Sequence, residues 1–529
     1  MVDQAKRILA GVNRNHTVGN VAILISGAYL LSRLLGLLRS RLLVAHFGIG
    51  LNLSAYNAAF RLPELLFTLL VSGAFAVAFI PVLTMHLAAN EREEAWRVTS
   101  SLLTLLGLAT IIGGIGIVVF ADPLTTLITP GFNHATHELT VSLTRIMAIT
   151  PVLFAISSVL GCVQQAFGRF VIFSLAGVLY NVGIIFGIVF LSRHMGIYGV
   201  AWGVVIGVAL QSLLQWLGLY GLGYKYRPAL NIRLAGVRRT LILMLPRSID
   251  QGIDQINYSV ETIIGSLVGG AAIAQFSLAN DLKNVPLALI GSSITTAVFP
   301  RLAARAASGA RTELIETYVQ TARLILFLSI PAAIFAIIAR GYVVRLLIGS
   351  GDPTVANTLG WYAATIVFTS LFLLVSRIYY ALQDTRTPLY LSLGSIPLNI
   401  ILSIILAHSY GVAGLAMSAS AVSALETFAL LVILHKRQGG FGERSIWAGA
   451  WRMIIAALIM VPILYTFVAR YLPLYAVDRG FTVLAPKFIL ILLVGLTAYL
   501  VPCYLMRLKE ANLFIGRVKE FMARSLSLI

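Results

Sequence analysis

The chain has 529 residues, of which 59% are hydrophobic and only 11% are charged. This balance excludes an ordinary soluble globular protein and is typical of a polytopic membrane protein. The formal net charge of +19 would indicate nucleic-acid binding in a soluble chain. Here the basic residues lie mostly in short loops between apolar segments, so we expect a membrane orientation signal and no nucleic-acid partner.

Apolar segments follow one another along nearly the whole chain, and a membrane-spanning helix needs ~20 such residues. The fold class predicted is therefore an all-α polytopic membrane protein. Fourteen spans are predicted, at residues 18–47, 54–88, 97–121, 138–166, 169–192, 197–222, 238–269, 272–304, 314–339, 355–382, 387–407, 411–435, 446–470 and 483–506. The first is interpreted as an uncleaved span, because its apolar run is too long for a signal peptide.

The charges of the loops predict the orientation. The stretch "YKYRPALNIRLAGVRRT" after the sixth span is basic, as are both tails, whereas "ADPLTTLITPGFNHATHE" after the third span has no Lys or Arg. The positive-inside rule then places both termini in the cytoplasm. Arg340 and Arg345 lie on the predicted outer side and are the exception.

The two halves of the chain resemble each other. "AFAVAFIPVL" at 74–83 is echoed by "SITTAVFPRL" at 293–302, a longer pair aligns Asn181 with Asn399, and "YGVAWG" at 198–203 is echoed by "YGVAGL" at 410–415. The offset of about 210–220 residues corresponds to six spans. Because six is an even number, both halves of the chain enter the membrane in the same direction. Parallel repeats of this kind are typical of secondary transporters.

These patterns predict the domain organisation. We expect a cytoplasmic tail (1–17), a first six-helix lobe (18–222), a basic cytoplasmic linker (223–237), a second six-helix lobe (238–438), an appended helix pair (439–506) and a basic tail (507–529).

Motifs of enzymatic chemistry are not found. The sequence has no GxxxxGK[ST] loop, no HExxH pair and no GxSxG elbow. We therefore predict no catalytic residue, metal site or cofactor, and interpret the protein as a transporter rather than an enzyme. Without a nucleotide site, such a transporter would draw on an ion gradient or the membrane potential.

Three arginines lie within the first span, in "LSRLLGLLRSRLLVAHFG". Arg33 lies roughly 22 Å along the helix, near mid-membrane. Ionisable groups at such depth mark functional sites by default. Arg33 and Arg39 are about 120° apart on a straight helix, so they converge only if the helix bends or unwinds near Gly36. Arg41 is interpreted as an interface anchor.

The second span holds Arg61 and Glu64 on either side of Pro63. Residues three apart share one helical face. Two interpretations stay open: a local ion pair that neutralises itself, or a basic group poised at a broken helix.

Polar residues also interrupt the seventh and eighth spans. Asp250, Asp254, Asn257 and Glu261 form one helical stripe, which must face protein or water rather than lipid. The eighth span adds Asp281 and Lys283. These charges are either a structural network between the halves or a coupling and gating site. An arginine-lined cavity suits an anion such as phosphate, whereas a cation exporter would need unpaired carboxylates.

Four stretches resemble the MurJ (MviN) family of lipid II flippases, in the multidrug/oligosaccharidyl-lipid/polysaccharide exporter superfamily. They are "SRLLGLLRSRLLVAHFG", "AAFRLPELLFTLLVSGAFAVAFIPVL", "LANDLKNVP" with "ITTAVFPRL", and "YYALQDTRTPLYLSLGSIPLNIILSIIL".

The resemblance implies two parallel six-helix lobes around a central cavity and two further helices with a hydrophobic groove. It implies movement of an undecaprenyl-pyrophosphate-linked peptidoglycan precursor, lipid II, across the bacterial inner membrane by alternating access. It also assigns Arg33, Arg39 and Arg61 to pyrophosphate binding, leaving the other span charges as gating or coupling groups.

The chain departs from the family pattern at four places where charges are common. Ser40 and Ser54 stand where acidic residues are common, Phe67 and Thr68 stand where a basic residue is common, and Asp281 stands where arginine is common. The predicted partners are lipid II or a similar polyprenyl-pyrophosphate glycolipid, the bilayer and a coupling ion. The alternatives are a flippase for another polyprenyl-linked glycan, a drug/cation antiporter of the same superfamily, and a non-transporting scaffold for cell-wall synthesis.

Overall fold

The structure is a computed structural model that describes residues 18–475, 478, 480–513 and 516, and no strand occurs in these ranges. Within its helices, the side chains of residues 18–24, 26, 72–74, 245–247, 249 and 250 are not described. The predictions for tail 1–17, for residues 517–529 and for the side chain of Asp250 therefore lie outside the described residues.

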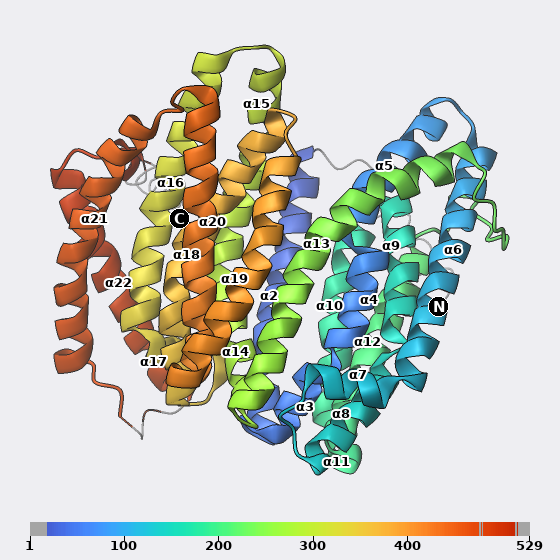
Figure 1. The fold of residues 1–529 in the computed structure, drawn as a ribbon, viewed down its shortest axis with the longest axis horizontal. Coiled ribbons are helices and arrows are strands. Elements are labelled where there is room, and N and C mark those ends of the chain that lie inside the picture. The colour runs from blue at the N-terminus through green and yellow to red at the C-terminus, as the bar shows by residue number, and fades with distance from the viewer. Residues whose placement is uncertain (1–17, 476–477, 479, 514–515, 517–529) are drawn as a thin grey trace, which may run out of the picture. The chain divides into compact units, whose positions relative to one another are not determined.

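The chain divides into two compact units, Met1–Ala274 and Gln275–Ile529. The helices of the first unit appear in blue to green in Figure 1. They are α2 (Val18–Phe47), α3 (Leu51–Ala59), α4 (Arg61–Leu70), α5 (Ser72–Ala88), α6 (Arg92–Val119), α7 (Ala121–Ile128), α8 (His134–Met147), α9 (Thr150–Ala166), α10 (Phe170–Phe186), the π-helical turn η1 (Gly187–Leu191), α11 (Ser192–Met195), α12 (Ile197–Leu217) and α13 (Ala235–Val268).

Helix α14 (Ala272–Pro286) crosses the boundary, and the remaining helices belong to the second unit. They are η2 (Leu287–Ser292), α15 (Ser293–Ala307), α16 (Arg311–Ile338), α17 (Arg340–Ile348), α18 (Pro353–Ala381), α19 (Arg386–Tyr410), α20 (Val412–Gln438), α21 (Glu443–Thr466), η3 (Phe467–Tyr471) and α22 (Phe481–Leu505).

Each predicted span coincides with a helix or a run of consecutive helices. Twelve helical segments are long and apolar enough to cross a membrane within the described ranges. Helices α2 and α13 are also long, at 30 and 34 residues, and they carry the arginines and the polar stripe. The all-α membrane fold is confirmed, and the total of fourteen spans stays a prediction.

Two short helices occur where loops were expected. Helix α7 follows α6, and α17 follows α16 at the corresponding place in the second half. In α17, Tyr342 donates its hydroxyl to the carbonyl of Leu472 at 2.6 Å, and Arg345 donates to the carbonyl of Tyr475 at 2.5 Å. Arg345, an exception to the orientation rule, therefore holds the segment that leads into α22.

The cores of the two units are built from different helices. In the first unit, α5, α6 and α9 enclose buried residues such as Phe75, Phe79 and Leu102, and the first turns of α13 join them. In the second unit, α16, α21 and α22 lie side by side (Figure 1) and bury Met453 and Tyr499. Burying apolar side chains between helices in this way fixes the helix pairs within each unit.

Glycine contacts define the register of the repeat. A methyl group on Gly199 would lie 2.5 Å from the carbonyl carbon of Leu191, and one on Gly414 would lie 2.2 Å from the carbonyl oxygen of Leu406. These pairs correspond, as do Gly196 and Gly411, which start α12 and α20 with φ of 56° and 59°. In this register Asn399 lies about one helical turn beyond the position of Asn181. This register differs by three residues from the predicted alignment of the two asparagines, and by three residues in the other direction from the predicted echo of YGVAWG by YGVAGL, which pairs Gly199 with Gly411.

Candidate functional site

The first span is one uninterrupted α-helix from Val18 to Phe47, so the structure shows no unwinding at Gly36. The side chain of Arg33 is exposed, and its Nε and Nη2 donate to the hydroxyl of Tyr29 at 3.1 and 2.8 Å. Arg39 is half-buried. The two arginines therefore stand on separate faces of a regular helix, as expected for a helix that has not opened at Gly36.

Arg39 interacts with two tyrosines of the first unit. Its charge interacts electrostatically with the hydroxyls of Tyr56 on α3 and Tyr180 on α10. Tyr56 is buried, and Tyr180 packs against Phe154 with ring centres 5.6 Å apart. The phenol oxygens of both tyrosines can act as acceptors.

Arg61 is more deeply buried than Arg33 and Arg39. Its Nη1 lies 3.2 Å from Oε2 of Glu64, and the two side chains are 8% and 42% exposed. Its Nε donates to the carbonyl of Asn57 at 3.3 Å, and its guanidinium lies 3.8 Å from the ring centre of Tyr258 on α13. The local ion pair, one of the two interpretations above, is therefore present. The same contacts connect α4 to α13.

The polar stripe on α13 changes in exposure along the helix. Asp254 is exposed, Asn257 is half-buried, and Glu261 is buried, with 7% of its surface exposed. Within the first unit, α13 packs against α4 and α5. A carboxylate as buried as Glu261 must be compensated by polar neighbours.

Two positions that depart from the family pattern are occupied by buried serines. Ser54 is fully buried, and its hydroxyl oxygen accepts a hydrogen bond from the N–H of Ala274 at 3.2 Å. Ser40 is 5% exposed. Ser54 thus fixes the start of α14, so in this chain a neutral hydrogen bond occurs where a carboxylate is common.

In the second unit, Lys283 and Asp281 differ in surroundings. The ammonium of Lys283 lies 4.4 Å from the ring centre of Tyr362 on α18, whereas Asp281 is exposed. Lys283 therefore places its charge against α18, on a different bearing from Asp281.

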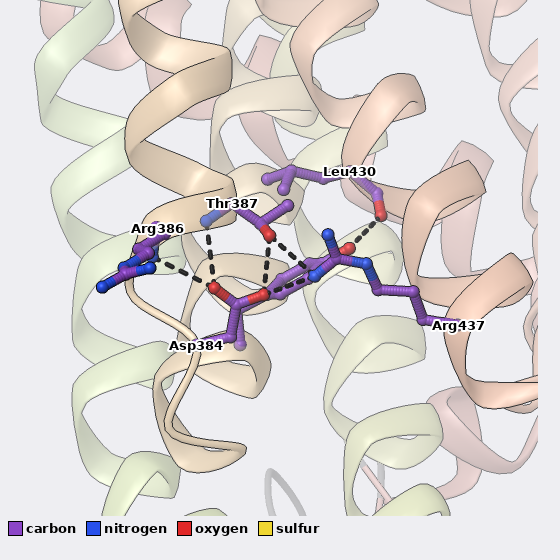
Figure 2. Close-up of polar contacts among 6 residues, drawn as sticks. Asp384, Arg386, Thr387, Leu430 and Arg437 are labelled. Atoms are coloured by element: carbon purple, nitrogen blue, oxygen red, sulfur yellow. Dashed lines mark hydrogen bonds and ion pairs between the residues drawn. The ribbon is translucent and has the colours of Figure 1, made fainter.

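The "QDTRTP" stretch binds the ends of three helices together (Figure 2). Asp384 Oδ1 accepts from the backbone N–H groups of Arg386 and Thr387 at 3.1 and 3.0 Å, which caps α19. Its Oδ2 accepts from the Thr387 hydroxyl and from Arg437 of α20, both at 2.6 Å. This motif, one of the most specific in the sequence, therefore stabilises the fold.

Sequence reasoning missed the aromatic partners of the arginines. Tyr258 on α13 contacts Arg61, and Tyr56 on α3 and Tyr180 on α10 interact electrostatically with Arg39. Their spacing gives no signal, because each reaches its arginine only after the helices pack. Among the described residues, no group of three or more His, Cys, Asp or Glu side chains could hold a metal ion.

Comparison with known proteins identifies one family and a shared fold. The family model "Lipid II flippase MurJ" matches residues 43–485. A probable lipid II flippase MurJ of Bdellovibrio bacteriovorus is 29% identical over 507 residues, covering 93% of this chain and 95% of the relative.

Two solved structures share the fold. The lipid II flippase MurJ in an inward closed conformation has a TM-score of 0.76 at 23% identity, covering 92% of this chain and 98% of that one. An inward-facing multidrug resistance transporter of the MATE family has a TM-score of 0.65 at 15% identity, covering 80% and 99%. The family match extends over most of the chain, from the end of α2 to α22, and the chain therefore belongs to the lipid II flippase MurJ family.

Proposed function

We propose that this protein moves lipid II from the inner to the outer leaflet of the bacterial inner membrane, with both termini in the cytoplasm. Family membership supports the substrate. The observation that carries the proposal is Arg61, a buried guanidinium held by one carboxylate and one aromatic ring. A buried arginine retains its charge, and phosphate oxygens match its planar donors bidentately.

Arg33, Arg39 and Arg61 are the proposed pyrophosphate ligands. In the structure each is already engaged, by Tyr29, by Tyr56 and Tyr180, and by Glu64 respectively. Binding then exchanges these neighbours for phosphate oxygens. The exchange keeps every guanidinium satisfied, which matters because an unpaired buried charge costs several kcal/mol.

Glu64 is proposed as the counter-charge that releases Arg61 to the substrate and takes it back afterwards. Asp250, Asp254, Asn257 and Glu261 on α13, with Asp281 and Lys283 on α14, are proposed to gate the cavity or couple transport to an ion. The lobes 18–222 and 238–438 would rock in alternating access, while the isoprenoid tail stays in lipid or beside residues 439–506. A flippase of this kind makes and breaks no covalent bond and is not an enzyme.

The test is complementation of cells depleted of their own lipid II flippase, with variants expressed from a plasmid. We expect the wild-type chain to restore growth and Arg33→Ala, Arg39→Ala and Arg61→Ala to fail at normal membrane abundance. Arg41→Ala is the matched control, since Arg41 lies on the same helix and is interpreted as an interface anchor. Failure of the abundant wild-type chain would exclude lipid II and favour another polyprenyl-linked glycan.

A transport assay separates the remaining alternatives. Purified protein in liposomes is supplied with fluorescent lipid II on one leaflet, and a membrane-impermeant quencher reports its arrival on the other. Proton- or sodium-driven export of organic cations by the same liposomes, without lipid II movement, would instead indicate a drug/cation antiporter.

A further inference from the structure

Asn181 of α10 binds the backbone of α2 one residue before Arg33. Asn181 is 6% exposed, and its Nδ2 donates to the carbonyl oxygen of Ser32 at 3.2 Å and approaches the Ser32 hydroxyl at 3.3 Å. It also donates to the carbonyl of Gly177 at 3.0 Å. Because these neighbours present carbonyl oxygens, the amide nitrogen must face them and the amide oxygen must point elsewhere.

The oxygen of the Asn181 side-chain amide faces Gly36. Asn181 Oδ1 is buried and has no hydrogen-bond partner in the described part of the chain. It is the atom nearest to a methyl group built on Gly36, at 3.8 Å. In a regular α-helix the N–H of Gly36 donates to the carbonyl of Ser32. The amide of Asn181 therefore lies alongside one helical hydrogen bond, with its nitrogen on the acceptor and its oxygen toward the donor residue.

We propose that Asn181 is a positioning residue that lets α2 open at Gly36. When the Ser32–Gly36 hydrogen bond breaks, Asn181 Nδ2 keeps the Ser32 carbonyl satisfied and Oδ1 accepts the released N–H of Gly36. Helices bend where a side chain inserts into their hydrogen-bond ladder. Inside a membrane, freed backbone groups must find such partners in neighbouring helices.

The opening has a purpose that rests on the proposed function. Arg33 and Arg39 stand about 120° apart on a straight helix, and Gly36 lies midway between them. A bend at Gly36 is what brings both guanidinium groups toward one pyrophosphate. Close packing holds α10 at this turn, because a methyl group on Gly177 would lie 3.0 Å from the Ser32 hydroxyl oxygen. Asn181 thus acts through α2 and does not contact the substrate itself.

Hydrogen–deuterium exchange of the purified full-length protein in lipid nanodiscs tests this step directly. In Asn181→Leu, which removes both hydrogen-bonding atoms, we expect the amide of Gly36 to exchange about fivefold to tenfold more slowly than in the wild type, the factor that one hydrogen bond provides. Lipid II transport in the liposome assay should fall by a similar factor. If Asn181→Leu does not fold, Asn181→Ala makes the same test with less bulk.

Two matched controls separate this role from general packing. Ser32→Ala keeps the carbonyl that Asn181 binds, and Asn399→Leu replaces a buried asparagine of the second unit that bonds Ser418. Both should leave exchange at Gly36 unchanged. Unchanged or faster exchange at Gly36 in Asn181→Leu would overturn the proposal, because Asn181 would then only support the straight helix. Exchange does not depend on the substrate, so failure of the wild type to move lipid II would count against the proposed function alone.

Discussion

The guanidinium of Arg61 lies 3.8 Å from the ring centre of Tyr258, so α4 and α13 meet at a buried cation. Arg61 begins α4, and Tyr258 follows Asn257 of the polar stripe on α13. The contact joins the predicted anion site to the predicted gating helix inside one compact unit. A ligand that draws Arg61 away from this ring therefore acts on α13 as well.

Replacing Tyr258 tests that connection. Tyr258→Leu removes the aromatic face under Arg61, and we expect a loss of about 1–2 kcal/mol of stability, the range of a desolvated cation–π contact. Thermal unfolding of the purified protein in detergent measures it. Tyr258→Phe retains the ring and should lose less stability than Tyr258→Leu. Equal losses in the two variants would attribute the effect to the hydroxyl instead.

Neutralising Glu64 should strengthen anion binding. In Glu64→Gln the Arg61 guanidinium loses its charged partner, so a phosphate ligand no longer competes with a carboxylate. We expect the Kd for farnesyl pyrophosphate to fall about fivefold, equivalent to ~1 kcal/mol. Thermophoresis in detergent measures it.

The control for this variant is a second ion pair of the first unit with the same spacing of three residues. Glu94 on α6 lies 3.6 Å from Arg97, three residues later. Glu94→Gln removes the same charge away from the site and should leave the Kd unchanged. If Glu64→Gln bound the ligand no better than Glu94→Gln, competition for Arg61 would be ruled out.

A small residue on α12 supports the tyrosine beside Arg39. A methyl group on Gly207 would lie 2.4 Å from the carbonyl oxygen of Tyr180, so the backbones of α10 and α12 must separate in Gly207→Ala. Overpacking of this kind costs about 1–3 kcal/mol. We expect a lower Tm and slower lipid II movement in liposomes. Gly116→Ala, where nothing lies within 4 Å of the added methyl group, adds helix propensity without overpacking and should lower neither quantity.

Asp384 should make part of the stability depend on pH. Burial opposes ionisation of its carboxylate, but hydrogen bonds from Thr387 and Arg386 and the charge of Arg437 outweigh burial, so the pKa of Asp384 lies below its usual 3.8. A carboxyl group with a lowered pKa in the folded state stabilises the fold above pH 3.8, and this contribution disappears as the pH falls through the folded-state pKa.

We therefore expect Asp384→Asn to cost up to about 1 kcal/mol at pH 7, from the lost charge in a partly exposed ion pair, because asparagine keeps an oxygen that can accept the hydrogen bonds capping α19. Below pH 3 the difference from the wild type should shrink toward zero. Unfolding midpoints in denaturant at the two pH values measure it. A difference that does not change with pH would mean that the charge of Asp384 contributes nothing.

The local sequence was sufficient to predict where the helices lie. Apolar runs of membrane-spanning length recur along the chain, and every predicted span coincides with helical structure. Membrane insertion forces backbone groups to be satisfied within each segment, so hydropathy alone determines such helices. Of the two breaks that divide the second span into α3, α4 and α5, the one at Phe60 has Pro63 in the following first turn as its signal, whereas the one at Val71 has no comparable signal.

Charged positions were also visible in the sequence, because an arginine in an apolar run is conspicuous. The residues that surround these charged side chains were not visible in the sequence. The sequence left Arg61 and Glu64 as either a local pair or a poised cation, and only the packing of α13 revealed Tyr258 as the third member. The register of the repeat likewise depended on close contacts at Gly199 and Gly414.

The sequence by itself determined the membrane class, the helical segments and the family, since these follow from hydropathy and from motifs within single stretches of chain. Only the tertiary structure decided which side chains meet the arginines and that Asn181 lies against the Ser32–Gly36 turn. The physical reason is the distance along the sequence over which each kind of interaction acts. Hydropathy and helical periodicity act over neighbouring residues, whereas a hydrogen bond between α10 and α2 joins residues 149 positions apart and exists only after the helices have packed.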